Sequence, residues 1–186
     1  MKPINEMSAG ELAAFVASHL MQCDIEVVLS GGACVSIWSE GLYVSADLDL
    51  IGDGTTPRSS LRKALAEIGF AEKGRQFFHP EAKFFLDCPP GPVALGREPP
   101  KEIRTIEFAT GSLRLLSPTD CVKDRLLAWY HWQDRQSLEQ AALVAERNPV
   151  DLDELRAWSK REGKADAFEE IRGRLSPPRS RGAGTK

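Results

Sequence analysis

The sequence predicts a mixed α/β (α+β) fold, in which a small mixed sheet with flanking helices is followed by a C-terminal helical region. Up to residue 116, short β-branched or aromatic runs alternate with amphipathic helical segments, and glycine- and proline-rich turns separate them. Beyond that point only the helical period recurs. We therefore expect an α/β domain at 1–116, a helical region at 117–175 and a disordered basic tail at 176–186.

The first expected elements alternate between helix and strand. Ser8 and Glu11 form a capping box at the start of an amphipathic helix. A packed or rim position is favoured over a ligand role for His19, which lies near the apolar stripe of that helix. Ile25–Leu29 is short, apolar and β-branched, as expected of a buried strand, and Ala33–Trp38 is expected to form a short helix.

The middle of the chain is expected to be rich in strands. Ala46–Ile51 alternates strictly between apolar and acidic residues, which predicts a half-buried strand. Thr56 and Pro57 predict the start of a helix that ends at Gly69. Four further strands are expected at Gln76–His79, Lys83–Asp87, Arg104–Phe108 and Ser112–Leu116. Helices are then expected at Pro118–Trp132, Arg135–Glu146, Leu152–Arg161 and Ala165–Arg172.

Composition narrows the class of protein. The chain has 186 residues, of which 42% are hydrophobic, and a net charge of −3. A chain of this length can bury a core without a metal or a disulfide, and its mild acidity argues against binding nucleic acid or membrane by bulk charge. No apolar run approaches the ~18 residues of a membrane span, and no signal peptide opens the chain, so we expect a cytoplasmic protein with no membrane partner. The four cysteines are scattered without a C-x-x-C pair, which favours neither a zinc site nor a disulfide scaffold.

Two carboxylates are the most informative feature of the strand at Ala46–Ile51. Asp47 and Asp49 are two residues apart, so both project from one face, ~6–7 Å apart along the strand. Neighbouring carboxylates repel each other, and a divalent cation would compensate their charge. Oxygen ligands favour Mg²⁺ or Mn²⁺. A solvated polar strand face is the alternative interpretation of this D-x-D pattern.

A glycine pair precedes these carboxylates. Ser30, Gly31 and Gly32 end one expected strand and open a helix, where a phosphate can approach the backbone and bind free N–H groups. A plain turn would use the same residues. A phosphate cradle beside a metal pair is what nucleotidyl transfer requires, because two metals clamp the attacking and leaving oxygens.

Gly31-Gly32-Ala33, followed by the segment Ser45-Ala46-Asp47-Leu48-Asp49-Leu50, resembles the signature of the DNA polymerase beta-type nucleotidyltransferase superfamily. The resemblance is closest to AbiEii-like bacterial nucleotidyltransferases and covers roughly residues 25–145. It implies a sheet of nucleotidyltransferase type and a third carboxylate, for which Asp87 is the best match. It also implies a basic residue on the first helix of the helical half, for which Arg125 is preferred over Lys123.

The resemblance implies a metal-dependent enzyme that moves a nucleoside monophosphate from a nucleoside triphosphate (NTP) to an acceptor hydroxyl. Asp47, Asp49 and Asp87 would be the catalytic carboxylates and would hold Mg²⁺ or Mn²⁺. The nucleotide would contact Ser30, Gly31, Gly32, Ser45 and Arg125. Lys83 is a further candidate for a nucleotide contact, because its even spacing from Asp87 on the expected strand would put both side chains on one face. The acceptor would be an RNA such as tRNA, or a protein, and the chain could belong to a toxin–antitoxin pair with a cognate partner protein. The alternatives are a non-catalytic nucleotide-binding or regulatory protein with the same fold, and a purely structural module.

Overall fold

The computed structural model describes residues 2–175, so the basic tail expected at 176–186 lies outside the described residues. The helices in this part of the chain are α1 (Ala9–Gln22), α2 (Gly31–Trp38), α3 (Arg58–Glu67), α4 (Pro118–Trp132), α5 (Arg135–Arg147), α6 (Leu152–Arg161) and α7 (Ala165–Ile171). The strands are β1 (Val27–Ser30), β2 (Asp47–Gly52), β3 (Ala71–Lys73), β4 (Gln76–Phe78), β5 (Phe85–Asp87), β6 (Ile103–Phe108) and β7 (Gly111–Leu116).

The seven strands form one mixed sheet with the order β3-β4-β5-β2-β1-β7-β6. The strands β1 and β2 pair antiparallel, whereas β2 pairs parallel with β5, and β1 pairs parallel with β7. The β3–β4, β4–β5 and β6–β7 pairs are antiparallel. This sheet, with helices beside it and a helical C-terminal region, confirms the predicted fold class.

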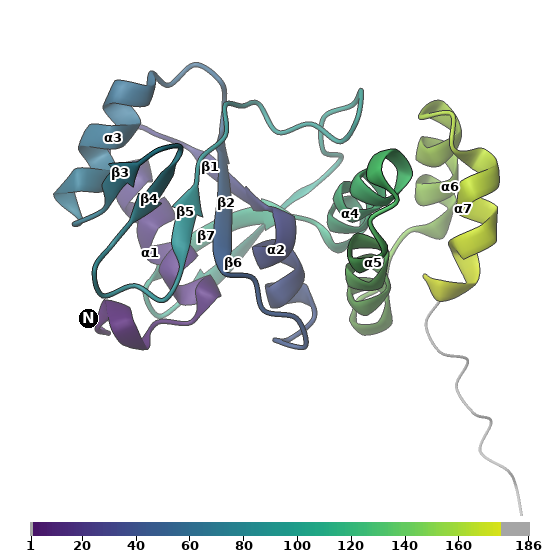
Figure 1. Ribbon diagram of the computed structural model, residues 1–186, viewed down its shortest axis with the longest axis horizontal. Helices are drawn as coiled ribbons and strands as arrows, with labels where there is room; N and C mark the ends of the chain where they lie inside the picture. The colour runs from purple at the N-terminus through teal and green to yellow at the C-terminus, as the bar shows by residue number, and fades with distance from the viewer. Residues whose placement is uncertain (1, 176–186) are drawn as a thin grey trace, which may run out of the picture.

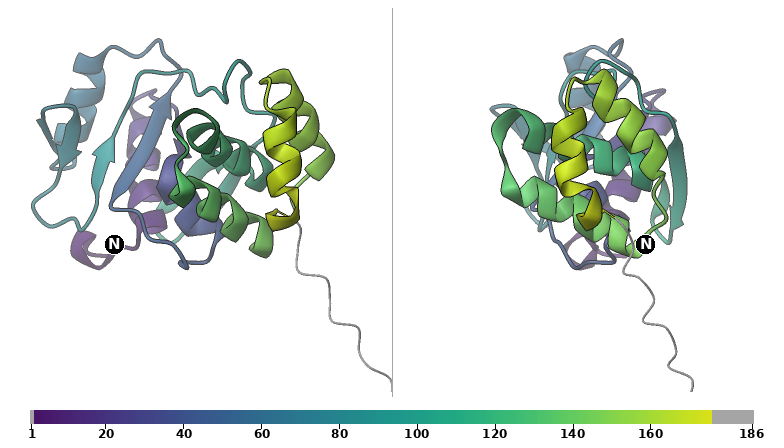
Figure 2. Two further views of the ribbon diagram at one scale, coloured as in Figure 1. Left: turned by 45° about the vertical axis from the view of Figure 1, so that its right-hand side comes forward. Right: turned by 90° about the vertical axis from the view of Figure 1, so that its right-hand side faces the viewer.

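The helices fall into two groups (Figure 1). Helix α1 packs on β7 and β1 and contacts α3, and its buried face includes Leu12, Val16 and Leu20. Helix α2 follows β1 directly and reaches across to α4 and α5. Figure 1 and the left view of Figure 2 place α6 and α7 beyond α4 and α5, at the end of the molecule far from α3. The boundary predicted at residue 116 coincides with the end of β7, and its division into domains stays a prediction.

Several element boundaries differ from those predicted. Helix α2 begins at Gly31 rather than Ala33, so the glycine pair forms its first turn. Helix α3 begins after Pro57 rather than after Thr56, because Asp53 instead accepts hydrogen bonds from the backbone N–H groups of Thr55 and Thr56. Strand β3 was not predicted at all; it is three residues long and half exposed, so it carries almost no hydrophobic pattern.

Other local predictions are confirmed. Ser8 and Glu11 form the capping box at the start of α1, and Ser117 caps α4 by accepting a hydrogen bond from the backbone N–H of Asp120. All four cysteines are free thiols, and three of them are buried. Across residues 2–175 no helix has both the length and the apolar character that crossing a membrane would require.

Candidate active site

Strands β2 and β5 place three carboxylates on one face of the sheet. Along β2 the burial alternates, with Leu48 and Leu50 fully buried and Asp47 and Asp49 half-buried, as the sequence pattern predicted. Because β5 pairs parallel with β2, Asp87 lies directly beside Asp49 in register. Residues paired in register on neighbouring strands project to the same side of a sheet. The structure therefore places Asp87 with the D-x-D pair.

The turn from β1 into α2 closes over this face. Ser30 is buried and pairs in register with Asp49, and Gly31 has a φ of +65°. A Cβ added to Gly31 would lie 1.7 Å from Oδ2 of Asp49. Position 31 therefore requires glycine for two reasons. Its backbone is left-handed, and the Asp49 carboxylate occupies the space that a side chain would need.

The backbone of Gly32 lies equally close to a second residue of the site, Ser45. A Cβ on Gly32 would lie 2.8 Å from Oγ of Ser45. The Ser45 hydroxyl donates a hydrogen bond to Oδ1 of Asp47, and the Ser45 backbone N–H donates to Oγ of Ser36 at 3.1 Å. Ser45 is thus packed between the glycine turn and Asp47, where it orients that carboxylate.

A fourth carboxylate, Asp124 on α4, was missed by the sequence reasoning. Its Oδ2 accepts hydrogen bonds from the Gly31 backbone N–H at 3.2 Å and from Nη2 of Arg125 at 2.6 Å. Asp124 lies between Lys123 and Arg125 in the sequence, and the family resemblance predicted only a basic residue of this helix at the site. No local signal marks it, because its place beside Gly31 depends on how α4 packs against α2.

Crowding of negative charge sets the protonation of Asp49. Burial, together with the neighbouring carboxylates of Asp47, Asp124 and Asp87, raises its pKa to about 7. The Arg125 guanidinium acts in the opposite direction but does not compensate. A half-buried carboxyl that titrates near neutral pH among three others marks a candidate functional site.

The two basic residues of α4 point to different places. Arg125 is largely buried, donates to Asp124 and, through Nη1, to Oε1 of Gln140 at 3.3 Å. Lys123 is 2% exposed and forms ion pairs with Asp120 and Glu154, so its ammonium group does not contact the aspartate cluster of the sheet. Arg125 is therefore the one of the two that faces the aspartates.

The prediction for Lys83 rested on a strand that the structure does not contain. We expected a strand from Lys83 to Asp87, in which even spacing would put both side chains on one face. Strand β5 begins only at Phe85, and Lys83 is exposed in the bend before it. The face-sharing argument is thus wrong, and a nucleotide contact by Lys83 stays a prediction without that support.

The donor set fits a hard divalent cation. The four aspartates offer only carboxylate oxygens, which Mg²⁺ and Mn²⁺ prefer. Within residues 2–175, no three of these carboxylates bring ligand oxygens within 4.8 Å of one another. That spread suits Mg²⁺ bound through one or two carboxylates, with water and phosphate oxygens completing its shell.

A cavity of about 390 Å³ includes Asp87 in its lining but none of the other three aspartates. It is lined by Asp87 and Cys88, by the following Pro89–Gly91 turn, and by Arg58 of α3. The guanidinium of Arg58 is held by Glu72 and by two backbone carbonyls, those of Cys88 and Arg75. Leu50 and Val27 also line the cavity, and Leu50 alternates with Asp49 along β2, so the cavity extends over the face of the sheet opposite the aspartates.

No family model matches the chain, and no curated protein is similar enough to count as a relative. Among solved structures, the chain is similar to an antigenic nucleotidyltransferase-like protein from Paracoccidioides brasiliensis, with a TM-score of 0.58 and 12% identity over 95% of this chain and 97% of that one. It is also similar to the antibiotic-resistance factor ANT(2'')-Ia, with a TM-score of 0.50 and 17% identity over 90% and 94% of the two chains.

These likenesses show that the chain has the nucleotidyltransferase fold, as the sequence resemblance implied. The AbiEii-like branch stays a prediction.

Proposed function

We propose that the chain is a metal-dependent nucleotidyltransferase, which moves a nucleoside monophosphate from an NTP to an acceptor hydroxyl and releases pyrophosphate. The observation that carries the proposal is the position of Asp49. This carboxylate lies against the Gly31 turn and is surrounded by Asp47, Asp87 and Asp124, on a fold shared with nucleotidyltransferases. A purely structural strand gains nothing from such crowding, because like charges on neighbouring strands destabilise the sheet.

Each residue of the site takes a role that its surroundings support. Asp47 and Asp49 would hold Mg²⁺ or Mn²⁺, and the Ser45 hydroxyl would fix the orientation of Asp47. Bound divalent ions would neutralise charge on the phosphates and polarise the reacting oxygens. Asp87 would complete the metal site or accept the proton of the acceptor hydroxyl, since it lies beside Asp49 on the same face of the sheet.

The triphosphate would bind at the first turn of α2. Backbone N–H groups at Ser30, Gly31 and Gly32 lie at a helix N-terminus, where an anion is stabilised. Arg125 would add a planar guanidinium, which suits phosphate oxygens. Asp124 now accepts hydrogen bonds from both the Gly31 N–H and Arg125. A phosphate would therefore have to displace this carboxylate from its donors.

The acceptor and the biological setting come from the sequence resemblance alone. We infer an RNA such as tRNA, or a protein, as acceptor, and a cytoplasmic toxin–antitoxin setting with a cognate partner protein. The second candidate function is a non-catalytic protein that binds nucleotide with the same residues. Two departures favour it: Arg125 stands where related sequences more commonly carry a lysine, and Tyr43-Val44 stands where they commonly carry an arginine.

Transfer of label from NTP tests the proposal. The chain would be incubated with each α-labelled NTP and Mg²⁺, with total RNA in one arm and lysate protein in the other, and scored for labelled acceptor and for pyrophosphate. We expect label transfer that is lost in Asp49→Asn and kept in Asp166→Asn, which changes an exposed aspartate of α7. Mg²⁺-dependent NTP binding without pyrophosphate would favour the non-catalytic candidate, and absence of NTP binding with every metal would refute both.

A further inference from the structure

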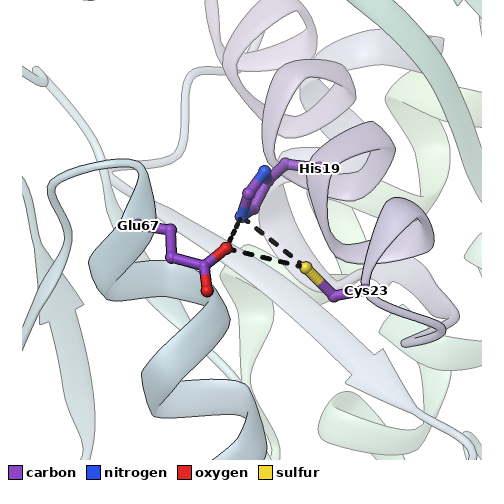
Figure 3. A group of neighbouring side chains, drawn as sticks. All are labelled: His19, Cys23 and Glu67. Atoms are coloured by element: carbon purple, nitrogen blue, oxygen red, sulfur yellow. Dashed lines mark hydrogen bonds and ion pairs between the residues drawn. The ribbon is translucent and has the colours of Figure 1, made fainter.

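A second group of potential metal ligands lies between α1 and α3, outside the aspartate cluster (Figure 3). His19 and Cys23 are four residues apart at the C-terminal end of α1, so they share a face of the helix. Glu67 is the last residue of α3. We propose that His19, Cys23 and Glu67 bind a zinc-class divalent cation that joins the ends of the two helices.

The ligand atoms form a triangle of the size that a tetrahedral ion requires. The distances are 3.6 Å from Nε2 of His19 to Oε2 of Glu67, 3.9 Å from Nε2 to Sγ of Cys23, and 4.0 Å from Sγ to Oε2. Zinc bond lengths of about 2.0–2.3 Å give tetrahedral edges of about 3.4 Å between nitrogen and oxygen and about 3.6 Å to sulfur. Each edge needs to shorten by only a few tenths of an ångström.

The three ligand atoms face one another across the gap between α1 and α3. In Figure 3 the Cys23 sulfur, one Glu67 oxygen and one ring nitrogen of His19 point toward one another from two different helices. Glu67 has half of its side chain exposed, so it can close the remaining gap, whereas His19 is 18% exposed and its Nε2 must give up the contact with the Ala64 carbonyl. Solvent can therefore reach the site, and water can occupy the fourth position.

The chemistry of this donor set differs from that of the active site. Imidazole, thiolate and carboxylate together favour zinc and cobalt, whereas the four aspartates offer hard oxygens that favour magnesium or manganese. The sequence spacing argued against a zinc site because no C-x-x-C pair is present. The spacing of cysteines cannot reveal this site, because it has one cysteine and its third ligand comes from α3, 44 residues beyond Cys23.

His19 has a second partner that a metal would have to replace. Its Nε2 lies 2.8 Å from the carbonyl oxygen of Ala64, which the end of α3 leaves without its usual donor because the Ile68 N–H bonds to Leu65 instead. Metal binding at Nε2 would leave the ring proton on Nδ1 and release the proton of the Cys23 thiol. A metal-bound water could then donate to the Ala64 carbonyl.

Cobalt(II) provides the direct test, because a cobalt–thiolate bond gives a charge-transfer band in the near ultraviolet that carboxylate ligands do not give. The full chain would be kept reduced and titrated with Co²⁺ alone. We expect the band to saturate at one ion per chain, to disappear in Cys23→Ser, and to remain in Asp49→Asn. Zn²⁺ should displace the cobalt, and Mg²⁺ should not.

Two more variants distinguish cobalt binding by all three residues from cobalt binding by the Cys23 thiol alone. Glu67→Gln and His19→Gln should each weaken cobalt binding at least about tenfold, since loss of even outer-shell partners typically costs 10–100-fold. Glu139→Gln, an exposed glutamate on α5, is the matched control and should bind as wild type. Glu67→Gln leaves the bond between His19 and Ala64 in place, so its result does not depend on whether His19→Gln folds.

Thermal unfolding gives an independent readout. Zn²⁺ at 100 times its dissociation constant should raise the melting temperature of the wild type by roughly 5–10 °C, and the rise should vanish in Cys23→Ser. Absence of the thiolate band, or a band whose affinity is unchanged in both Glu67→Gln and His19→Gln, would overturn the proposal. His19 would then serve only to cap the Ala64 carbonyl.

Discussion

The carboxylate of Asp49 fills the space that any side chain at Gly31 would need. A Cβ on Gly31 would lie 1.7 Å from Oδ2 and 2.8 Å from Cγ of Asp49, and the Gly31 backbone is left-handed at φ +65°. A side chain at position 31 would therefore require the Asp49 carboxylate to move.

Gly31→Ala should be far more damaging than left-handed strain alone explains. Gly74→Ala is the matched control, because Gly74 has a φ of +67° and open space around its α-carbon. We expect the control to lose about 1 kcal/mol of unfolding free energy, from the left-handed backbone. Gly31→Ala should lose about 3 kcal/mol or more, measured by denaturant unfolding.

A double variant locates the cause of that loss. In an Asp49→Ala background the clashing oxygen is gone, so the cost of Gly31→Ala should fall toward that of Gly74→Ala. An equal cost in both backgrounds would show that Asp49 does not occupy this space.

Asp49→Asn should stabilise the metal-free chain at neutral and alkaline pH. Burial and the adjacent carboxylates raise the pKa of Asp49 from 3.8 to about 7. Between these values the folded state binds a proton that the unfolded state has lost, so the stability of the wild type falls as pH rises from about 4 to about 7. The variant lacks this loss, and we expect it to be roughly 1–3 kcal/mol more stable at pH 8.

The difference should disappear at pH 4, where the wild-type carboxyl is protonated in the folded state. Unfolding of both chains at pH 4, 6 and 8 in the presence of a chelator measures it, with Asp166→Asn as the control that should show no such trend. A variant that is less stable than the wild type at pH 8 would mean that Asp49 is held by a favourable contact instead.

The sequence was sufficient for β2 and for the start of α4, where the signal is local. The alternation in β2 fixed which faces Asp47 and Leu48 occupy, and the capping residue Ser117 fixed the start of α4. Pairing of Asp87 with Asp49 required the order of strands in the sheet, which the family resemblance implied and the residues alone did not. Asp124 could not be found, because its contact with Gly31 joins residues 93 positions apart.

Glu154 should make the chain less stable as pH falls. Burial tends to raise the pKa of this carboxyl, but its ion pairs with Lys123 and Lys101 outweigh burial and lower the pKa to about 2. The unfolded state has a value of about 4.5, so the stabilisation is complete above pH 4.5 and is lost as pH falls toward 2. Glu154→Gln should therefore cost about 1–3 kcal/mol at pH 7 and roughly half of that or less near pH 3.

Urea unfolding at pH 7, 4 and 3 measures this change. Glu170→Gln alters an exposed glutamate of α7 and should have little effect at any of these values. A Glu154→Gln cost that is the same at pH 3 as at pH 7 would contradict a contribution from the ionised carboxylate. Lys123 keeps its contact with Asp120 in this variant, so the buried ammonium is not left alone.

Arg125→Ala should weaken NTP binding. The guanidinium is the side chain of α4 that faces the aspartates, and a hydrogen bond to a charged group contributes about 1.5–3 kcal/mol, or roughly ten- to a hundredfold in affinity. Arg125→Lys should recover part of the loss, since the charge remains while the planar fork is absent. Calorimetric titration with Mg²⁺ and NTP measures both, and an unchanged affinity in Arg125→Ala would remove Arg125 from the site.

Asp124→Asn should strengthen NTP binding, in contrast to the other aspartate variants. In the free chain the Asp124 carboxylate accepts hydrogen bonds from Arg125 and from the Gly31 N–H, the two groups proposed to bind phosphate. The amide is neutral, so it repels the triphosphate less and holds the guanidinium less tightly. We expect an affinity gain of about fivefold or more, which corresponds to about 1 kcal/mol.

The gain should be absent when Arg125 is also replaced by alanine, because there is then no guanidinium to release. If Asp124 instead holds the metal, Asp124→Asn will weaken binding and raise the Mg²⁺ concentration needed, and the same calorimetric titration, repeated at several Mg²⁺ concentrations, distinguishes the two roles.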